Sequence, residues 1–309
     1  MSDLHSLVEE YLAFRTARGF QPNHKLARVL NQFLASLPAS AKDGPLFTNR
    51  QALTWAHAPA GGSPAWWSYR LSAVRQFAAY LAGSGLPVEV PAVRQGAGGT
   101  RCATPYLYAD ADVRALMRAA EELFTPLRAA TMAVLTGLLT VTGMRIGEVL
   151  RLTVGDLDLD DGIVVIARAK FGRQRIVLLD ATSCRAVRGY LLRPDRHRLG
   201  VAPERPLLTT GKGTSVPENN ARGAFHRMTQ HAGLPVRAGA RPRPHDLRHS
   251  FATRAMIEAY SSGRNPARTL TLLSAWLGHS NPADTYWYLQ AAPEVAAIAV
   301  GRLEEGPQS

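Results

Sequence analysis

The sequence predicts a mainly α-helical protein of two domains, the second of which carries a small antiparallel β element. Three observations predict this fold class. Apolar residues recur at helical spacing through most of the chain, a proline- and glycine-rich stretch interrupts that spacing, and two short β-branched runs follow it. We expect a helical domain over residues 1–90, a linker over 86–105 and a second domain over 106–309.

The first domain shows helical spacing of apolar residues in four segments. Three are expected over residues 3–18, 24–37 and 48–57, and the fourth begins at Pro64 and ends near Gly83–Gly85. The first segment stops at Gly19, a residue type that ends helices readily. Ser63 and Pro64 supply an N-cap and a first-turn proline for the fourth. These segments predict a small all-helical unit.

The stretch from Leu86 to Pro105 contains three prolines and three glycines and has no sustained apolar period. Such a composition is typical of an interdomain linker. The domain boundary is therefore expected in this stretch.

The second domain is predicted to be helical over residues 110–123, 125–141, 145–152, 181–192, 217–232, 245–260, 266–277, 282–290 and 294–303. Two apolar runs, Ile163–Ile166 and Arg175–Leu179, flank the polar loop segment Lys170–Arg173. This pattern predicts a β-hairpin with the lysine near its tip.

The net charge of +12, from 36 basic and 24 acidic residues, favours a polyanionic partner. Nucleic acid is favoured over an anionic membrane surface, although an arginine-rich genome composition explains the excess equally well. Residues 1–100 contain nine basic and five acidic residues, and residues 101–309 contain 27 basic and 19 acidic residues. Both domains are therefore expected to face the polyanion.

The two cysteines, Cys102 and Cys184, form neither a disulfide framework nor a zinc-ligand spacing. The N-terminus lacks the basic and apolar regions of a signal peptide. The apolar stretch Thr131–Val141 is too short to span a bilayer. A cytoplasmic protein is expected.

Arg145 follows Gly143 at an expected helix start, where free backbone N–H groups favour an anion. Glu148 lies three residues further on and so shares a helical face with Arg145. This pattern fits either a phosphate-binding arginine held by a carboxylate or an ordinary exposed ion pair.

His245 and Arg248 share a face of the helix that follows two proline-spaced arginines. A titratable imidazole beside a permanent cation suits a phosphate. His245 and His249 also have the spacing of a zinc-binding HExxH motif, with Asp246 in place of the glutamate. The adjacent arginine would repel a metal dication.

Further candidate residues are His279, in the segment Leu277–Ser280, and the tyrosines Tyr286 and Tyr288. The two tyrosines lie two residues apart, hence on nearly opposite faces of a helix, and periodicity does not choose between them. Lys170, flanked in sequence by Arg168, Arg173 and Arg175, suggests a finger that reaches into a duplex groove.

The ordered series TGMRIGEVLRL, AKFGRQRIVLL, HDLRHSFATR, WLGHS and DTYWYL, between Thr142 and Leu289, resembles that of the tyrosine recombinases of the phage-integrase type. The first domain is similar in position and helix count to the core-binding domain of that family, and the second to its catalytic domain. One departure is Phe171, where a glycine is frequent in the family.

The resemblance implies DNA cleavage and rejoining through a 3′-phosphotyrosyl intermediate, without a metal or nucleotide cofactor. The implied catalytic residues are Arg145, Lys170, His245, Arg248, His279 and Tyr288. Tyr288 would be the nucleophile because the family places it nine residues after the second histidine. His245 is the candidate base, since a tyrosine with a pKa near 10 needs one. The two arginines would clamp the phosphate, Lys170 would protonate the leaving 5′-oxygen and His279 would bind a phosphate oxygen.

The implied partners are duplex DNA at recombination sites and further copies of the chain. The resemblance implies a tetramer in which a C-terminal helix around Val295–Leu303 docks on a neighbouring subunit. Three alternatives stay open. A topoisomerase of type IB would relax DNA without recombining it, a basic helical protein would bind DNA without cleaving it, and a zinc hydrolase would use His245 and His249.

Overall fold

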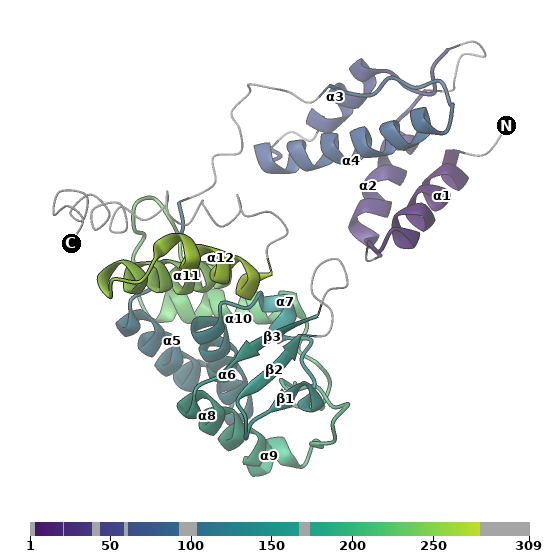
Figure 1. The fold of residues 1–309 in the computed structure, drawn as a ribbon. Coiled ribbons are helices and arrows are strands. Elements are labelled where there is room, and N and C mark those ends of the chain that lie inside the picture. Colours follow the sequence, from purple (N-terminus) through teal and green to yellow (C-terminus); the bar gives the residue numbers. More distant parts are fainter. Residues whose placement is uncertain are drawn as a thin grey trace, which may run out of the picture. The chain divides into compact units, whose positions relative to one another are not determined.

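A computed structural model describes residues 4–20, 22–38, 44–58, 61–92, 104–166 and 174–278. The chain divides into two compact units, Met1–Arg101 and Cys102–Ser309. Each unit is mainly helical, and the second also contains a small antiparallel sheet (Figure 1). The predicted fold class is confirmed.

The first unit contains four helices in its described part, α1 (Leu4–Ala17), α2 (His24–Ala35), α3 (Asn49–His57) and α4 (Pro64–Gly83). All four match predicted segments. Ser63 accepts a hydrogen bond from the Trp66 N–H at 3.2 Å, which confirms the N-cap predicted before Pro64. The apolar faces meet in a core that includes Val8, Val29, Leu30, Phe33, Val74, Phe77 and Leu81.

Both ends of the proline- and glycine-rich stretch pack on the unit next to them. The Leu46 N–H donates a hydrogen bond to the Pro87 carbonyl at 2.7 Å, which holds residues 86–92 on the first unit. At the other end, Pro105 is buried in the second unit. Residues 93–103, between these ends, lie outside the described residues.

The second unit has helices α5 (Asp110–Leu123), α6 (Pro126–Thr142), α7 (Ile146–Val149), α8 (Ala181–Leu192), α9 (Pro194–His197), α10 (Glu218–His231), α11 (Pro244–Ser261) and α12 (Pro266–Leu277). The expected helices 282–290 and 294–303 lie outside the described residues. Within the described ranges, no helix combines the length and the apolar character that crossing a bilayer requires.

The sheet of the second unit has the strand order β1 (Leu157–Asp158), β2 (Ile163–Ile166) and β3 (Arg175–Leu178) in the described residues. Strands β2 and β3 are antiparallel, with Ile163 opposite Leu178 and Ile166 opposite Arg175. The predicted hairpin is confirmed, whereas the two-residue strand β1 and the four-residue helix α9 were not predicted.

The helix predicted over residues 145–152 is wrong in length, because α7 ends at Val149. A short 3₁₀ helix, Val154–Asp156, follows instead. The backbone between them pairs with a distant segment, since the Leu207 N–H donates to the Leu152 carbonyl at 2.8 Å. This long-range pairing competes with continued helix and ends α7 after one turn.

Candidate active site

Three of the six predicted site residues lie in the described part of the chain, and the structure brings them together. Arg145 precedes α7, while His245 and Arg248 lie in the first turns of α11. The C-terminal ends of α6 and α12 lie next to Arg248, which binds a carbonyl oxygen at each of them (Figure 1). Lys170, His279 and Tyr288 lie outside the described residues.

Gly143 ends α6 with a φ of 64°, a left-handed conformation that favours glycine. A Cβ at this position would lie 2.6 Å from Cδ1 of Phe251 and 3.0 Å from Cδ2 of Leu277. Both conformation and space therefore require glycine here. The turn that follows brings Arg145 out at the N-cap of α7, not within its first turn as predicted.

Glu148 holds Arg145 through both backbone and side chain. The Arg145 N–H donates to Oε2 of Glu148 at 2.8 Å, and Nη1 donates to Oε1 at 3.0 Å. This confirms the predicted Arg145–Glu148 pair. The Arg145 side chain keeps 31% of its surface exposed, whereas that of Glu148 keeps 2%. The backbone N–H and Nη1 of Arg145 are thus held by Glu148, while the exposed part of its side chain is accessible to an anion.

A second arginine, Arg175 at the start of β3, binds the same carboxylate. Nη1 of Arg175 donates to Oε1 of Glu148 at 3.0 Å, and Nη2 donates to Oε2 at 2.6 Å. Burial by itself raises the pKa of Glu148, but the hydrogen bonds from Arg175 and Arg145 and their charges outweigh it and lower the pKa to about 2. Glu148 is therefore ionised at neutral pH.

Arg175 begins a strand, as the predicted hairpin places it, and its side chain lies in the protein against Glu148. Sequence reasoning missed this contact. The two residues are 27 positions apart, and no local spacing joins a strand residue to a helix residue at that distance. An available signal was the predicted hairpin itself, which places Arg175 in a strand and outside the loop.

Arg248 is buried in α11, with 2% of its surface exposed. Nη1 donates to the Gly143 carbonyl and Nη2 to the Leu277 carbonyl, each at 2.8 Å. One guanidinium thus joins the end of α6, two residues before Arg145, to the end of α12. A planar fork of N–H donors can hold two carbonyls at once.

The turn that leads to His279 is fixed by contacts of the preceding residues. The indole N–H of Trp276 donates to the Thr142 carbonyl at 2.8 Å, which joins α12 to α6. Gly278 ends α12 with a φ of 67°. His279 itself lies outside the described residues.

His245 is the second residue of α11 and is exposed. Neighbouring protein atoms nevertheless crowd its ring, and this desolvation lowers the pKa of His245 below its ordinary 6.5. The positive charge of Arg248 lowers this pKa further, while the negative charge of Asp246 opposes the change. The imidazole is therefore neutral at pH 7 and able to accept a proton.

The neighbours of His245 also bear on the zinc hypothesis. Its ring lies 4.8 Å from that of His249, centroid to centroid, with the planes perpendicular. Asp246 is fully buried and bound by Arg243, whose Nη2 lies 2.8 Å from Oδ1. Among the described residues, no three histidine, cysteine or acidic side chains gather as metal ligands.

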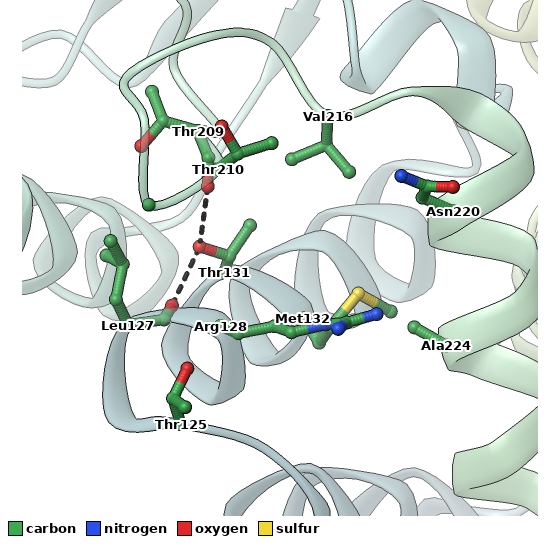
Figure 2. A pocket seen from close by; sticks show the side chains of 11 residues that line it. Thr125, Leu127, Arg128, Thr131, Met132, Thr209, Thr210, Val216, Asn220 and Ala224 are labelled. Carbon is green, nitrogen blue, oxygen red and sulfur yellow. Dashed lines mark hydrogen bonds between the residues drawn. The ribbon is translucent and has the colours of Figure 1, made fainter.

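A cavity of about 240 Å³ lies elsewhere in the second unit, between the start of α6, the 209–216 loop and α10 (Figure 2). Thr131 of α6 donates a hydrogen bond across it to the Thr209 carbonyl at 3.3 Å. None of the predicted site residues lines it. The candidate site is therefore the open surface around Arg145 and not this cavity.

Comparison with known proteins shows the family of the chain. The model of the phage integrase family matches residues 107–294. The integrase/recombinase y4rB of Sinorhizobium fredii is 36% identical over 98% of both chains. Tyrosine recombinase XerD of Pseudomonas aeruginosa is 30% identical over 72% of this chain and 70% of its own.

Solved structures share the fold. A XerH recombinase bound to a palindromic difH substrate matches 97% of this chain and 85% of its own, with a TM-score of 0.65 and 18% identity. A lambda integrase tetramer bound to a Holliday junction matches 92% of this chain and 76% of its own, with a TM-score of 0.64. Fold and relatives define a recombinase that cleaves and rejoins DNA. The chain belongs to the phage integrase family of tyrosine recombinases.

Proposed function

We propose that this chain exchanges DNA strands at specific sites, with Tyr288 as nucleophile and Arg145, Lys170, His245, Arg248 and His279 as the other catalytic residues. One observation carries the proposal. Arg248 donates to the carbonyl of Gly143 in the turn that presents Arg145, so the two arginines share one support. His245 lies beside Arg248 on the same helix.

In the proposed reaction the Tyr288 oxygen attacks the scissile phosphorus while the bond to the 5′-oxygen breaks. His245, neutral at pH 7, accepts the tyrosine proton, and Lys170 gives a proton to the departing 5′-oxygen. Arg145 and Arg248 stabilise the charge that develops on the non-bridging oxygens, and His279 hydrogen-bonds one of these oxygens. The 3′-phosphotyrosyl bond conserves the linkage energy, so a second 5′-hydroxyl reseals the strand without ATP or a metal.

Strand exchange between two duplexes breaks four strands, and each chain supplies one Tyr288. The proposed assembly is therefore a tetramer on paired sites, with the segment around Val295–Leu303 as the arm that docks on a neighbour. The reaction is proposed to take place in the cytoplasm, at the nucleoid.

The experiment is covalent capture. The full chain is incubated with nicked duplex fragments from the DNA flanking its gene, and denaturation-resistant protein–DNA adducts are sequenced to map the site. Tyr288→Phe is expected to abolish the adduct, while Tyr286→Phe, the matched control, retains it. An adduct that persists in Tyr288→Phe would move the nucleophile elsewhere.

Three further measurements separate the alternatives. Relaxation of supercoiled DNA without recombinant product would favour the topoisomerase, and tight binding with no cleavage would favour the non-catalytic DNA-binding protein. Stoichiometric zinc with loss of activity on chelation would favour the hydrolase built on His245 and His249.

A further inference from the structure

The carboxylate of Glu148 lies between two arginines, only one of which is open to solvent. Arg145 binds it through its N–H and Nη1 and keeps 31% of its side chain exposed. Arg175 binds both carboxylate oxygens, and its side chain keeps 10% exposed. The two arginines and the carboxylate together carry one net positive charge. Of the two arginines, Arg145 is the more exposed to solvent.

Arg175 also packs on the end of α12. A Cβ at Gly278 would lie 3.1 Å from Nη1 and 3.3 Å from Cδ of Arg175. The Arg175 guanidinium thus packs closely against Gly278. Arg175 therefore touches Glu148, three residues after Arg145, and Gly278, the residue before His279 in sequence, and it begins β3.

Charge balance shows what Arg175 changes at the site. Without it, Glu148 would have Arg145 as its remaining arginine partner, and the pair would carry no net charge. An anionic phosphate would then meet a neutralised arginine. With Arg175 present, the carboxylate charge is shared, and Arg145 keeps attraction for a phosphate while its orientation stays fixed.

We propose that Arg175 is a positioning residue for strand cleavage, which acts through Glu148 to keep Arg145 oriented and positively charged toward the scissile phosphate. This inference rests on the proposed function. Arg175 acts on the rate of cleavage and not on DNA binding, because its side chain is largely buried.

The test measures single-turnover adduct formation at saturating DNA on the nicked duplex mapped by covalent capture. Arg175→Gln is expected to lower the cleavage rate constant about 100-fold, with DNA affinity within about threefold of wild type. Arg175→Lys keeps the charge but loses the two-point contact, and its cleavage rate constant is expected to lie between those of wild type and Arg175→Gln. The matched control is Arg188→Gln, because Arg188 forms an exposed ion pair with Asp160 at 2.6 Å. It is expected to cleave at the wild-type rate.

A double variant shows whether Arg175 acts through Glu148. Arg175→Gln combined with Glu148→Gln leaves Arg145 with its full charge and leaves no unpaired buried carboxylate. It is expected to cleave no more slowly than the slower single variant. Losses that multiply in the double variant would overturn the proposal, as would a wild-type rate in Arg175→Gln. If Arg175→Gln fails to fold, the double variant is compared with Glu148→Gln alone, and equal rates support the proposal while a slower double variant overturns it.

A second readout separates this inference from the proposed function. If wild type forms no adduct, the proposed function fails and inorganic phosphate becomes the probe. Phosphate is then expected to raise the melting temperature of wild type and of Arg188→Gln more than that of Arg175→Gln. Equal shifts in all three proteins would overturn the inference.

Discussion

Nη1 of Arg248 donates a hydrogen bond to the carbonyl oxygen of Gly143 at 2.8 Å and so joins two segments 105 residues apart. The same guanidinium holds the Leu277 carbonyl through Nη2. Loss of the hydrogen bond to a buried carbonyl destabilises the folded state. This arginine therefore stabilises the fold of the site in addition to making its proposed contact with DNA.

Arg248→Lys is expected to destabilise the second unit by about 2–3 kcal/mol, because one ammonium cannot reproduce a fork that reaches two carbonyls. Denaturant unfolding followed by circular dichroism measures the change. The control Arg188→Lys removes an exposed contact and should stay within about 0.5 kcal/mol of wild type. Coincident unfolding curves for wild type and Arg248→Lys would contradict this role.

Gly143→Ala is expected to destabilise the second unit by about 2–4 kcal/mol. The added Cβ meets Phe251 at 2.6 Å, and the φ of 64° disfavours alanine. Gly223→Ala is the matched control, because Gly223 is exposed in α10 with no atom near its Cβ position. It should be neutral or stabilise the protein by up to about 1 kcal/mol. Equal melting temperatures for the two variants would show that Gly143 is not required.

The pH dependence of stability is expected to carry a contribution from Glu148. Its pKa is about 2 in the folded state, against an ordinary value of 4.5. Because the folded pKa is depressed, the stabilisation is complete above pH 4.5 and is lost as the pH falls toward 2, where the folded carboxylate also takes up a proton. The shift corresponds to about 3 kcal/mol.

Unfolding free energies measured between pH 2 and 6 test this expectation. Glu148→Gln should be less stable than wild type at pH 6, and the difference between them should shrink as the pH falls. A constant difference across the range would show that the carboxylate charge is not the source.

The rate of cleavage is expected to rise with pH to a plateau, with a midpoint below 6.5, since the lowered pKa of His245 makes the imidazole neutral there. His245→Asn should remove this rise and lower the plateau about 100- to 1000-fold. His226→Asn, on the exposed face of α10, is the control and should leave the profile unchanged. A midpoint above 6.5, or a rise retained in His245→Asn, would assign the titration to another group.

Local signals predicted most of the described elements. The apolar spacing of α1, α2 and α4 marks their buried faces, and the Ser63–Pro64 cap is a contact between near neighbours in sequence. The pair of Arg145 and Glu148 was also predictable, because three residues separate them. Interactions of this range depend on neighbouring side chains and not on the rest of the fold.

Other features depend on distant segments. The early end of α7 follows from the pairing of Leu152 with Leu207, and the buried position of Arg175 follows from its contact with Glu148. No spacing rule relates these residues, since their proximity arises only when the sheet packs against the helices. The sequence likewise predicts that Arg248 lies on a helix, but it does not predict the two carbonyls that Arg248 binds.

The sequence by itself determined the fold class, the hairpin and the set of residues proposed for the chemistry. Helical periodicity, helix caps and the order of motifs can be recognised in the sequence without knowledge of the tertiary structure. Only the tertiary structure decided how the described members of that set are held. Glu148 forms ion pairs with two arginines, and Arg248 donates hydrogen bonds to carbonyls at two helix ends. Buried polar groups require hydrogen-bond partners, and the fold supplies these partners from segments that are distant in sequence.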